Sequence, residues 1–169
     1  MQITSAYAGK MLKKLQEDKE FLLAKERRNS TYIVANNEEA VVPDFDFVEN
    51  TKEINQLNEQ IVALKHALNI QNATSTIRIQ DKLITIDMAL VMLAQLNSRK
   101  KSLDTMRQRQ PKCRVDNSYN SKNVSEYQYA NYNIADAQEE YERVDALIAA
   151  IQLELDKYNQ TVLFDVDID

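Results

Sequence analysis

Two segments of this sequence carry an apolar residue at alternating intervals of three and four positions, and this pattern restricts the fold more than any other feature. Such spacing places the apolar side chains on one face of an α-helix. Two long helices with one continuous apolar stripe each are expected to pair in left-handed, coiled-coil-like packing. The stripe in residues 47–74 comprises Ile54, Leu57, Ile61, Leu64 and Leu68, and the stripe in residues 134–162 includes Tyr141, Val144, Ile148, Ile151 and Leu155.

The rarity of glycine and proline indicates that the rest of the chain also consists of a few long elements. One Gly and two Pro in 169 residues are too few turn-forming residues for the many turns of an all-β fold. We therefore expect a mainly α fold, a single domain of residues 1–169 that forms an antiparallel four-helix bundle. Its acidic last residues, among them Asp165, Asp167 and Asp169, are expected to be disordered. The predicted helices span about 5–29, 47–70, 86–110 and 134–162.

Short β-hairpins are predicted in the connections between these helices. Residues 31–46 contain two β-branched patches around an Asn-Asn pair, which tolerates turn conformations. Residues 76–86 alternate apolar and polar side chains on both sides of a polar turn that begins at Gln80. The connection before the last helix contains Tyr127 and Tyr129 in the alternation of a short strand. We expect one or two of these hairpins to form.

Polar side chains stand where the ends of two helices are expected. Asp44 and Asp46 precede the second helix and Thr85 precedes the third, and oxygens at these positions accept hydrogen bonds from the first backbone N–H groups. The end of the second helix is rich in amides and hydroxyls. We predict that these side chains form a structural cap, and a ligand-binding role is the alternative. The predicted cap residues are Asn69, Asn72 and Thr74.

Charge and hydropathy argue against several classes of protein. The 21 basic and 26 acidic residues are well mixed, and a net charge of -5 gives no global field that favours nucleic acid or an anionic membrane. The longest apolar run, residues 84–96, falls short of the ~20 residues that a membrane-spanning helix needs. The amino terminus lacks the apolar core of a secretory signal, and the single Cys113 cannot form a disulfide framework. We therefore expect a cytoplasmic protein.

No arrangement of residues points to catalysis. His66 is the only histidine, which excludes the standard di-iron site of helical bundles because that site takes a His from each of two helices. Cys113 lies between two cations that favour a reactive thiolate, but no base or second cysteine accompanies it, so an ordinary loop cysteine is favoured. We expect no catalytic residue, no metal and no cofactor.

A basic run follows the middle of the third helix. Tyrosines at 119, 127, 129 and 132 come shortly after it and could stack on bases, while the cations could hold phosphates. The alternative is that the cations complement the helix dipole and pair with Glu139, Glu140 and Glu142, and we favour this reading over nucleic-acid binding. The run also contains Lys101, Lys112 and Arg114, and the candidate anion contacts are Arg99, Lys100, Arg107 and Arg109.

The run from Leu68 to Thr74, Leu-Asn-Ile-Gln-Asn-Ala-Thr, resembles an I-N-x-x-N-x-x-T type of turn in the septicolysin-like family of small helical bacterial proteins. The chain departs from the family pattern at Asp81-Lys82, where a Gly-containing turn is expected, and at Tyr158, which precedes Asn159 instead of following it. The resemblance covers most of the chain and implies a mostly helical protein without an assigned role, whereas the family name suggests a lytic toxin. The other similar motifs, in order, are Arg27-Arg28-Asn29, Pro43, Leu83 with Thr85, and Ile151-Gln152 followed by Asn159.

These features predict a non-enzymatic cytoplasmic protein, a helical-bundle scaffold or interaction protein that forms homo-oligomers through its heptad stripes. One alternative, implied only by the family name, is a lytic or membrane-perturbing protein. Another is weak nucleic-acid binding through the basic run at residues 99–114. The sequence indicates no particular protein partner.

Overall fold

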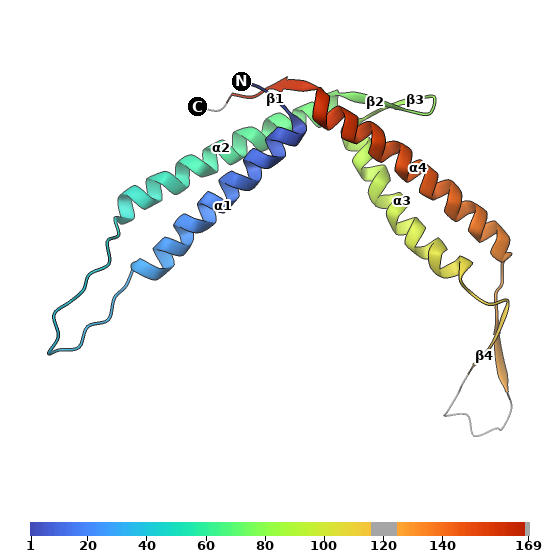
Figure 1. Cartoon of the computed structure of the whole chain (residues 1–169), viewed down its shortest axis with the longest axis horizontal. Coiled ribbons are helices and arrows are strands. Elements are labelled where there is room, and N and C mark those ends of the chain that lie inside the picture. Colours follow the sequence, from blue (N-terminus) through green and yellow to red (C-terminus); the bar gives the residue numbers. More distant parts are fainter. Residues whose placement is uncertain (116–124, 168–169) are drawn as a thin grey trace. The chain divides into compact units, whose positions relative to one another are not determined.

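A computed structural model describes residues 1–115 and 125–167 of the chain (Figure 1). This part of the chain is mainly helical and contains small two-stranded antiparallel sheets, which confirms the predicted class of fold. The second helix ends later than residue 70, and the third ends before residue 110. The helices are α1 (Ser5–Asn29), α2 (Phe47–Thr74), α3 (Ile86–Arg107) and α4 (Ile134–Thr161).

The strands form three antiparallel pairs within the described ranges. The hairpin predicted around Gln80 is confirmed, and Gln80 itself takes a positive φ of 53° in its turn. The strand predicted at Tyr127 and Tyr129 is confirmed as well. The pairs are β1 (Gln2–Thr4) with β6 (Leu163–Asp165), β2 (Thr76–Ile79) with β3 (Lys82–Thr85), and β4 (Lys112–Val115) with β5 (Glu126–Tyr129).

The hairpin predicted in residues 31–46 is wrong. The Glu38 backbone N–H donates to the carbonyl of Ala35 and closes a turn beside the Asn-Asn pair, but the flanking residues form no strand. Ile33 is 102% exposed and Val41 is 89% exposed. These side chains contribute no burial that would hold two strands together, whereas contacts of the Lys112 ammonium with the Tyr127 and Tyr129 rings join β4 to β5.

The chain end near residue 165 was expected to be disordered, and the structure corrects this for residues 163–165. They form β6, which pairs with β1, and the Val166 backbone N–H donates to the carbonyl of Met1. Phe164 and Val166 alternate with acidic residues and are buried, so the run is an amphipathic strand. Asp169 lies outside the described residues.

Internal contacts divide the chain into two compact units. Unit 1 comprises Met1–Ser75 and Asp156–Asp169, and unit 2 comprises Thr76–Leu155. Each unit contains an antiparallel pair of neighbouring helices, α1 with α2 and α3 with α4 (Figure 1). The expectation that residues 1–169 form one domain stays a prediction.

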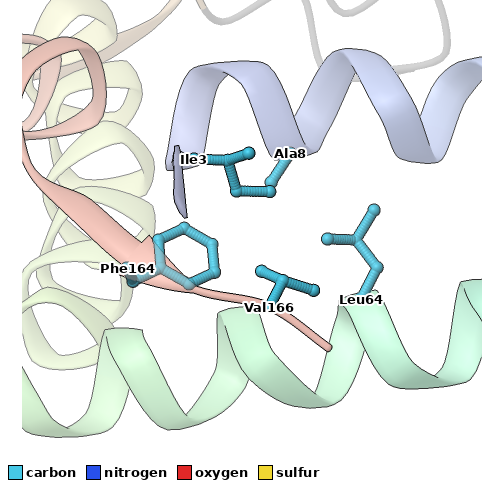
Figure 2. Close-up of a cluster of buried hydrophobic side chains, with 5 residues drawn as sticks. All are labelled: Ile3, Ala8, Leu64, Phe164 and Val166. Carbon is cyan, nitrogen blue, oxygen red and sulfur yellow. The ribbon is translucent and has the colours of Figure 1, made fainter. Parts of the chain in front are cut away.

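The core of unit 1 covers the stripe of α2. Leu64 of α2 is completely buried and faces Ala8 of α1, and the side chains of β6 fill the space between the two helices (Figure 2). Met11, Leu12 and Leu15 of α1 extend this contact. The buried cluster consists of Ile3, Ala8, Leu64, Phe164 and Val166.

The core of unit 2 covers the stripe of α4. Leu103 of α3 packs against Val144 and Ile148 of α4, and all three side chains are at most 5% exposed. The two stripes that we expected to pair with each other are therefore covered by α1 and by α3, the neighbours in sequence. A heptad pattern requires a covered face but does not name the helix that covers it. The half-buried residues around this core are Leu93, Leu96, Met106 and Tyr141.

The capping of α2 predicts a specific loss of stability. Asp46 accepts hydrogen bonds from the backbone N–H groups of Val48 at 2.8 Å and Glu49 at 3.0 Å, as expected for a cap residue. Asp46→Ala should lower the free energy of unfolding by about 1 kcal/mol in urea titrations. Asp44→Ala removes an equal charge without touching this cap and serves as the control; equal losses for the two variants would contradict the assignment.

The core of unit 1 generates a second prediction. Leu64→Ala should lower the free energy of unfolding by about 2–5 kcal/mol, because the removed methyl groups leave a cavity among buried neighbours. Val62→Ala, on the same helix but 67% exposed, should change it by less than about 0.5 kcal/mol. Chemical denaturation followed by circular dichroism measures both. A small effect of Leu64→Ala would show that α1 does not cover this face of α2.

Candidate functional site

The basic run of the sequence divides into two groups in the structure, and the first group holds α3 against α4. Lys100 forms an ion pair with Asp145 of α4. The Arg107 guanidinium donates to Asp104 at 2.7 and 2.8 Å and to Gln138 of α4 at 3.2 Å. Two of the four candidate anion contacts are therefore engaged inside unit 2.

A tyrosine that sequence reasoning placed only in the apolar stripe completes this contact. The centre of the Arg107 guanidinium lies 4.0 Å from the centroid of the Tyr141 ring, and the Lys100 ammonium lies 5.5 Å from it. A cation over an aromatic face is attracted by the ring quadrupole. The hydrogen bond to Asp145 raises the pKa of Lys100, and the hydrogen bond to Asp104 raises the pKa of Arg107. Both groups remain charged at neutral pH.

The acidic partners expected from sequence are used differently. Glu140 pairs with Arg143 of its own helix through two contacts of 2.7 Å. These hydrogen bonds lower the pKa of Glu140, and the charge of Arg99 adds to the effect. Glu142 accepts from Gln138. Along the described part of α4, the carboxylate that pairs with the basic run is Asp145.

The second group of cations lies on the exposed ribbon formed by β4 and β5. Lys112 pairs in register with Tyr129, and Arg114 pairs with Tyr127, so these four side chains share one side of the ribbon. The Lys112 ammonium lies 4.2 Å from the centroid of the Tyr127 ring and 5.4 Å from that of Tyr129. We call Lys112, Arg114, Tyr127 and Tyr129 the ribbon face.

The other candidate residues near the ribbon have distinct surroundings. Tyr132 donates its hydroxyl to the Met106 carbonyl at 2.7 Å and so links α3 to the residues before α4, whereas Tyr119 lies outside the described residues. Cys113 is exposed, and its thiol lies 3.6 Å from the Arg114 carbonyl. A cavity of about 210 Å³ lies beside the ribbon and is lined by Arg109, Gln110, Cys113, Gln128, Tyr129 and Ala130.

The predicted cap at the end of α2 is corrected in part. Asn69 and Asn72 lie within α2, which continues to Thr74, and Ser75 in an extended conformation ends it. The Thr74 hydroxyl does donate to a carbonyl of the last turn, that of Ile70, at 2.8 Å. The sequence did not reveal the contacts of Gln71, whose amide donates to the Ser75 hydroxyl at 2.9 Å and to the Tyr158 hydroxyl at 2.8 Å. Spacing within the sequence could not reveal a partner so distant along the chain.

The candidate oligomer stripe is largely used within the chain. Leu64 is buried in unit 1, and Leu68 is half-buried against the same cluster. In α4 the stripe residues Val144, Ile148, Ile151 and Leu155 are at most 5% exposed. The residues that keep partial exposure are Ile54, Leu57, Ile61 and Tyr141.

Metal and catalytic sites were not expected. His66 is exposed, as predicted for a surface histidine. Within residues 1–115 and 125–167, no group of three or more His, Cys, Asp or Glu side chains could hold a metal ion. None of the helices in these ranges is both long enough and apolar enough to cross a membrane.

Comparison with known proteins gives a fold and no function. No protein-family model matches the sequence, and no curated protein matches it either. The structure is similar to the crystal structure of a functionally unknown conserved protein from Corynebacterium diphtheriae, with a TM-score of 0.67 and 13% sequence identity. The match covers 98% of this chain and 100% of the other. The two proteins share a fold, and a role for this chain has to be argued from its own surface.

The Glu140–Arg143 pair predicts a dependence of stability on pH. Because the folded state lowers the pKa of Glu140, the pair stabilises the protein above the ordinary value of 4.5 and loses its effect as pH falls through the lower folded value. Glu140→Gln should lower the melting temperature slightly at about pH 7, and the difference from wild type should disappear near pH 3 or in about 1 M salt.

The control for this comparison is Glu139→Gln, which removes the neighbouring charge and leaves both contacts to Arg143 intact. Thermal melts of the three proteins across this pH range measure the effect. A difference between Glu140→Gln and wild type that persists or grows at low pH would show that the pair does not have the predicted role.

Proposed function

We propose that this protein is a non-enzymatic helical scaffold of the bacterial cytoplasm that self-associates, with helical hairpins of different copies packing together into an antiparallel bundle. The observation that carries the proposal is the segment of α3 from Met88 to Ala94, which is apolar on all sides of the helix. A helix of this kind is normally buried all round. Here only one side of it is buried.

The exposed side of α3 is formed by large apolar residues. Ile86 and Ala89 are buried on the core side, at 2% and 0% exposure. On the remaining faces, Met88 is 51% exposed, Leu90 48% and Val91 58%. Covering such side chains stabilises an association in proportion to the apolar area removed from water. A second copy of the chain offers a matching apolar face.

A similar but smaller patch lies on the outer side of α4. Leu153 is 68% exposed, and the exposed residues Ala146 and Ala149 precede it by seven and four positions, on the same helical face. Small residues beside one large one let another helix approach closely. Both helices of unit 2 therefore carry apolar surface on the side away from their shared core.

The proposed lack of catalysis and the proposed cytoplasmic location rest on the exposure and the contacts of single residues. The only histidine and the only cysteine are both exposed, and the candidate cations Lys100 and Arg107 form contacts within unit 2. A single free cysteine suits a reducing compartment. Membership of the septicolysin-like family is also part of the proposal and rests on the Leu68–Thr74 run and the order of the other motifs.

Light scattering after size exclusion tests the self-association. Wild-type protein should give a mass of at least twice 19.5 kDa. The double substitution Leu90→Lys and Val91→Lys places two charges on the apolar face and should weaken association by about tenfold or more. Val41→Lys with Val42→Lys, an adjacent pair outside the helices, is the matched control. Wild type that remains at 19.5 kDa at high concentration, or equal dissociation by the control, would overturn the proposal.

A further inference from the structure

The ribbon face combines positive charge with exposed aromatic rings, and the Lys112 ammonium lies against the near side of both rings. Antiparallel pairing places Lys112 beside Tyr129 and Arg114 beside Tyr127, on one side of β4 and β5. Tyr129 is 62% exposed and Tyr127 is 46% exposed. Positions two apart on a strand are separated by about 7 Å, roughly twice the thickness of a nucleobase. The two rings therefore stand in a row along β5, and the two cations stand in a parallel row along β4.

The charge on this side of the ribbon is uniformly positive among the residues described. Glu126, the acidic residue of β5, pairs with Val115 and therefore lies on the opposite side. Arg109 lines the cavity beside the ribbon together with Cys113 and Gln128, which stand on the opposite side from the ribbon face. Lys100 and Arg107 are engaged with α4. Within the basic run, Lys112 and Arg114 are the cations that share a side with the two exposed rings.

We propose that the ribbon face binds single-stranded nucleic acid, with bases stacking on Tyr127 and Tyr129 and phosphates held by Lys112 and Arg114. This inference is independent of self-association. Single strands expose the flat faces of their bases, and aromatic platforms lined by cations are the general way in which proteins hold them. Duplexes hide those faces, and polyphosphates and anionic membranes have none.

Fluorescence anisotropy with a labelled oligothymidylate of about 12 nucleotides and the full chain tests the proposal. Binding should strengthen at low salt, and two phosphate contacts predict a slope of about −1.4 for log K against log salt concentration. A duplex of equal length and an abasic strand of equal length should each bind at least about tenfold more weakly.

Matched variants separate stacking from charge. Tyr127→Ala with Tyr129→Ala should weaken binding about tenfold or more, whereas Phe at both positions, which keeps the rings, should preserve it. Tyr7→Ala with Tyr32→Ala removes two tyrosines of similar exposure from unit 1, 50% and 52%, and should have no effect. Lys112→Ala with Arg114→Ala should weaken binding and remove most of its salt dependence. Lys10→Ala with Lys14→Ala is the control of equal charge.

Several outcomes would overturn the proposal. One is the absence of salt-dependent binding by the wild-type chain at about 50 mM salt. Another is equal affinity for the abasic strand or the duplex, which would show that base stacking does not contribute. A third is equal weakening by the unit 1 controls, which would place the binding outside the ribbon face. Circular dichroism of each variant confirms that its helices are retained.

Discussion

Leu64 of α2 is removed from solvent by α1 and β6, and Leu103 of α3 is removed from solvent by α4. A helix has little stability of its own in water, so an apolar stripe has to be covered by a neighbouring element before the helix persists. Each compact unit does this with a single pair of helices. One pair forms only one layer, and a layer can bury only the side that faces its partner. The exposed apolar residues of α3 and α4 follow from this geometry.

The short strands complete these helical pairs without adding a second layer. β6 pairs with β1 and contributes Phe164 to the core of unit 1, and Val166, which follows the strand, joins the same cluster, so residues from both ends of the sequence share it. The ribbon of β4 and β5 contributes no side chain to a core, because all of its described residues are exposed. Because the ribbon covers no core, Tyr127 and Tyr129 stay exposed.

The cations at the end of α3 show how position decides the role of chemically similar residues. Lys100 and Arg107 contact α4. Lys100 pairs with Asp145, and Arg107 donates to Gln138 and lies over the Tyr141 ring. Lys112 and Arg114 stand on the ribbon, where their neighbours are two tyrosines. In the sequence all of them belong to one basic run. The first part of the run forms an ion pair with α4, and anion binding by the second part stays a prediction.

Sequence by itself determined the features that depend on local chemistry. The four helices, the caps at Asp46 and Thr85, the hairpin around Gln80 and the strand at Tyr127 all follow from spacing, turn residues and side-chain oxygens within a few positions. Only the tertiary structure decided which helix covers each stripe, that Gln71 meets Tyr158, and that β6 joins β1. These contacts join residues far apart in the chain, and a periodic pattern records that a face must be buried without recording its partner.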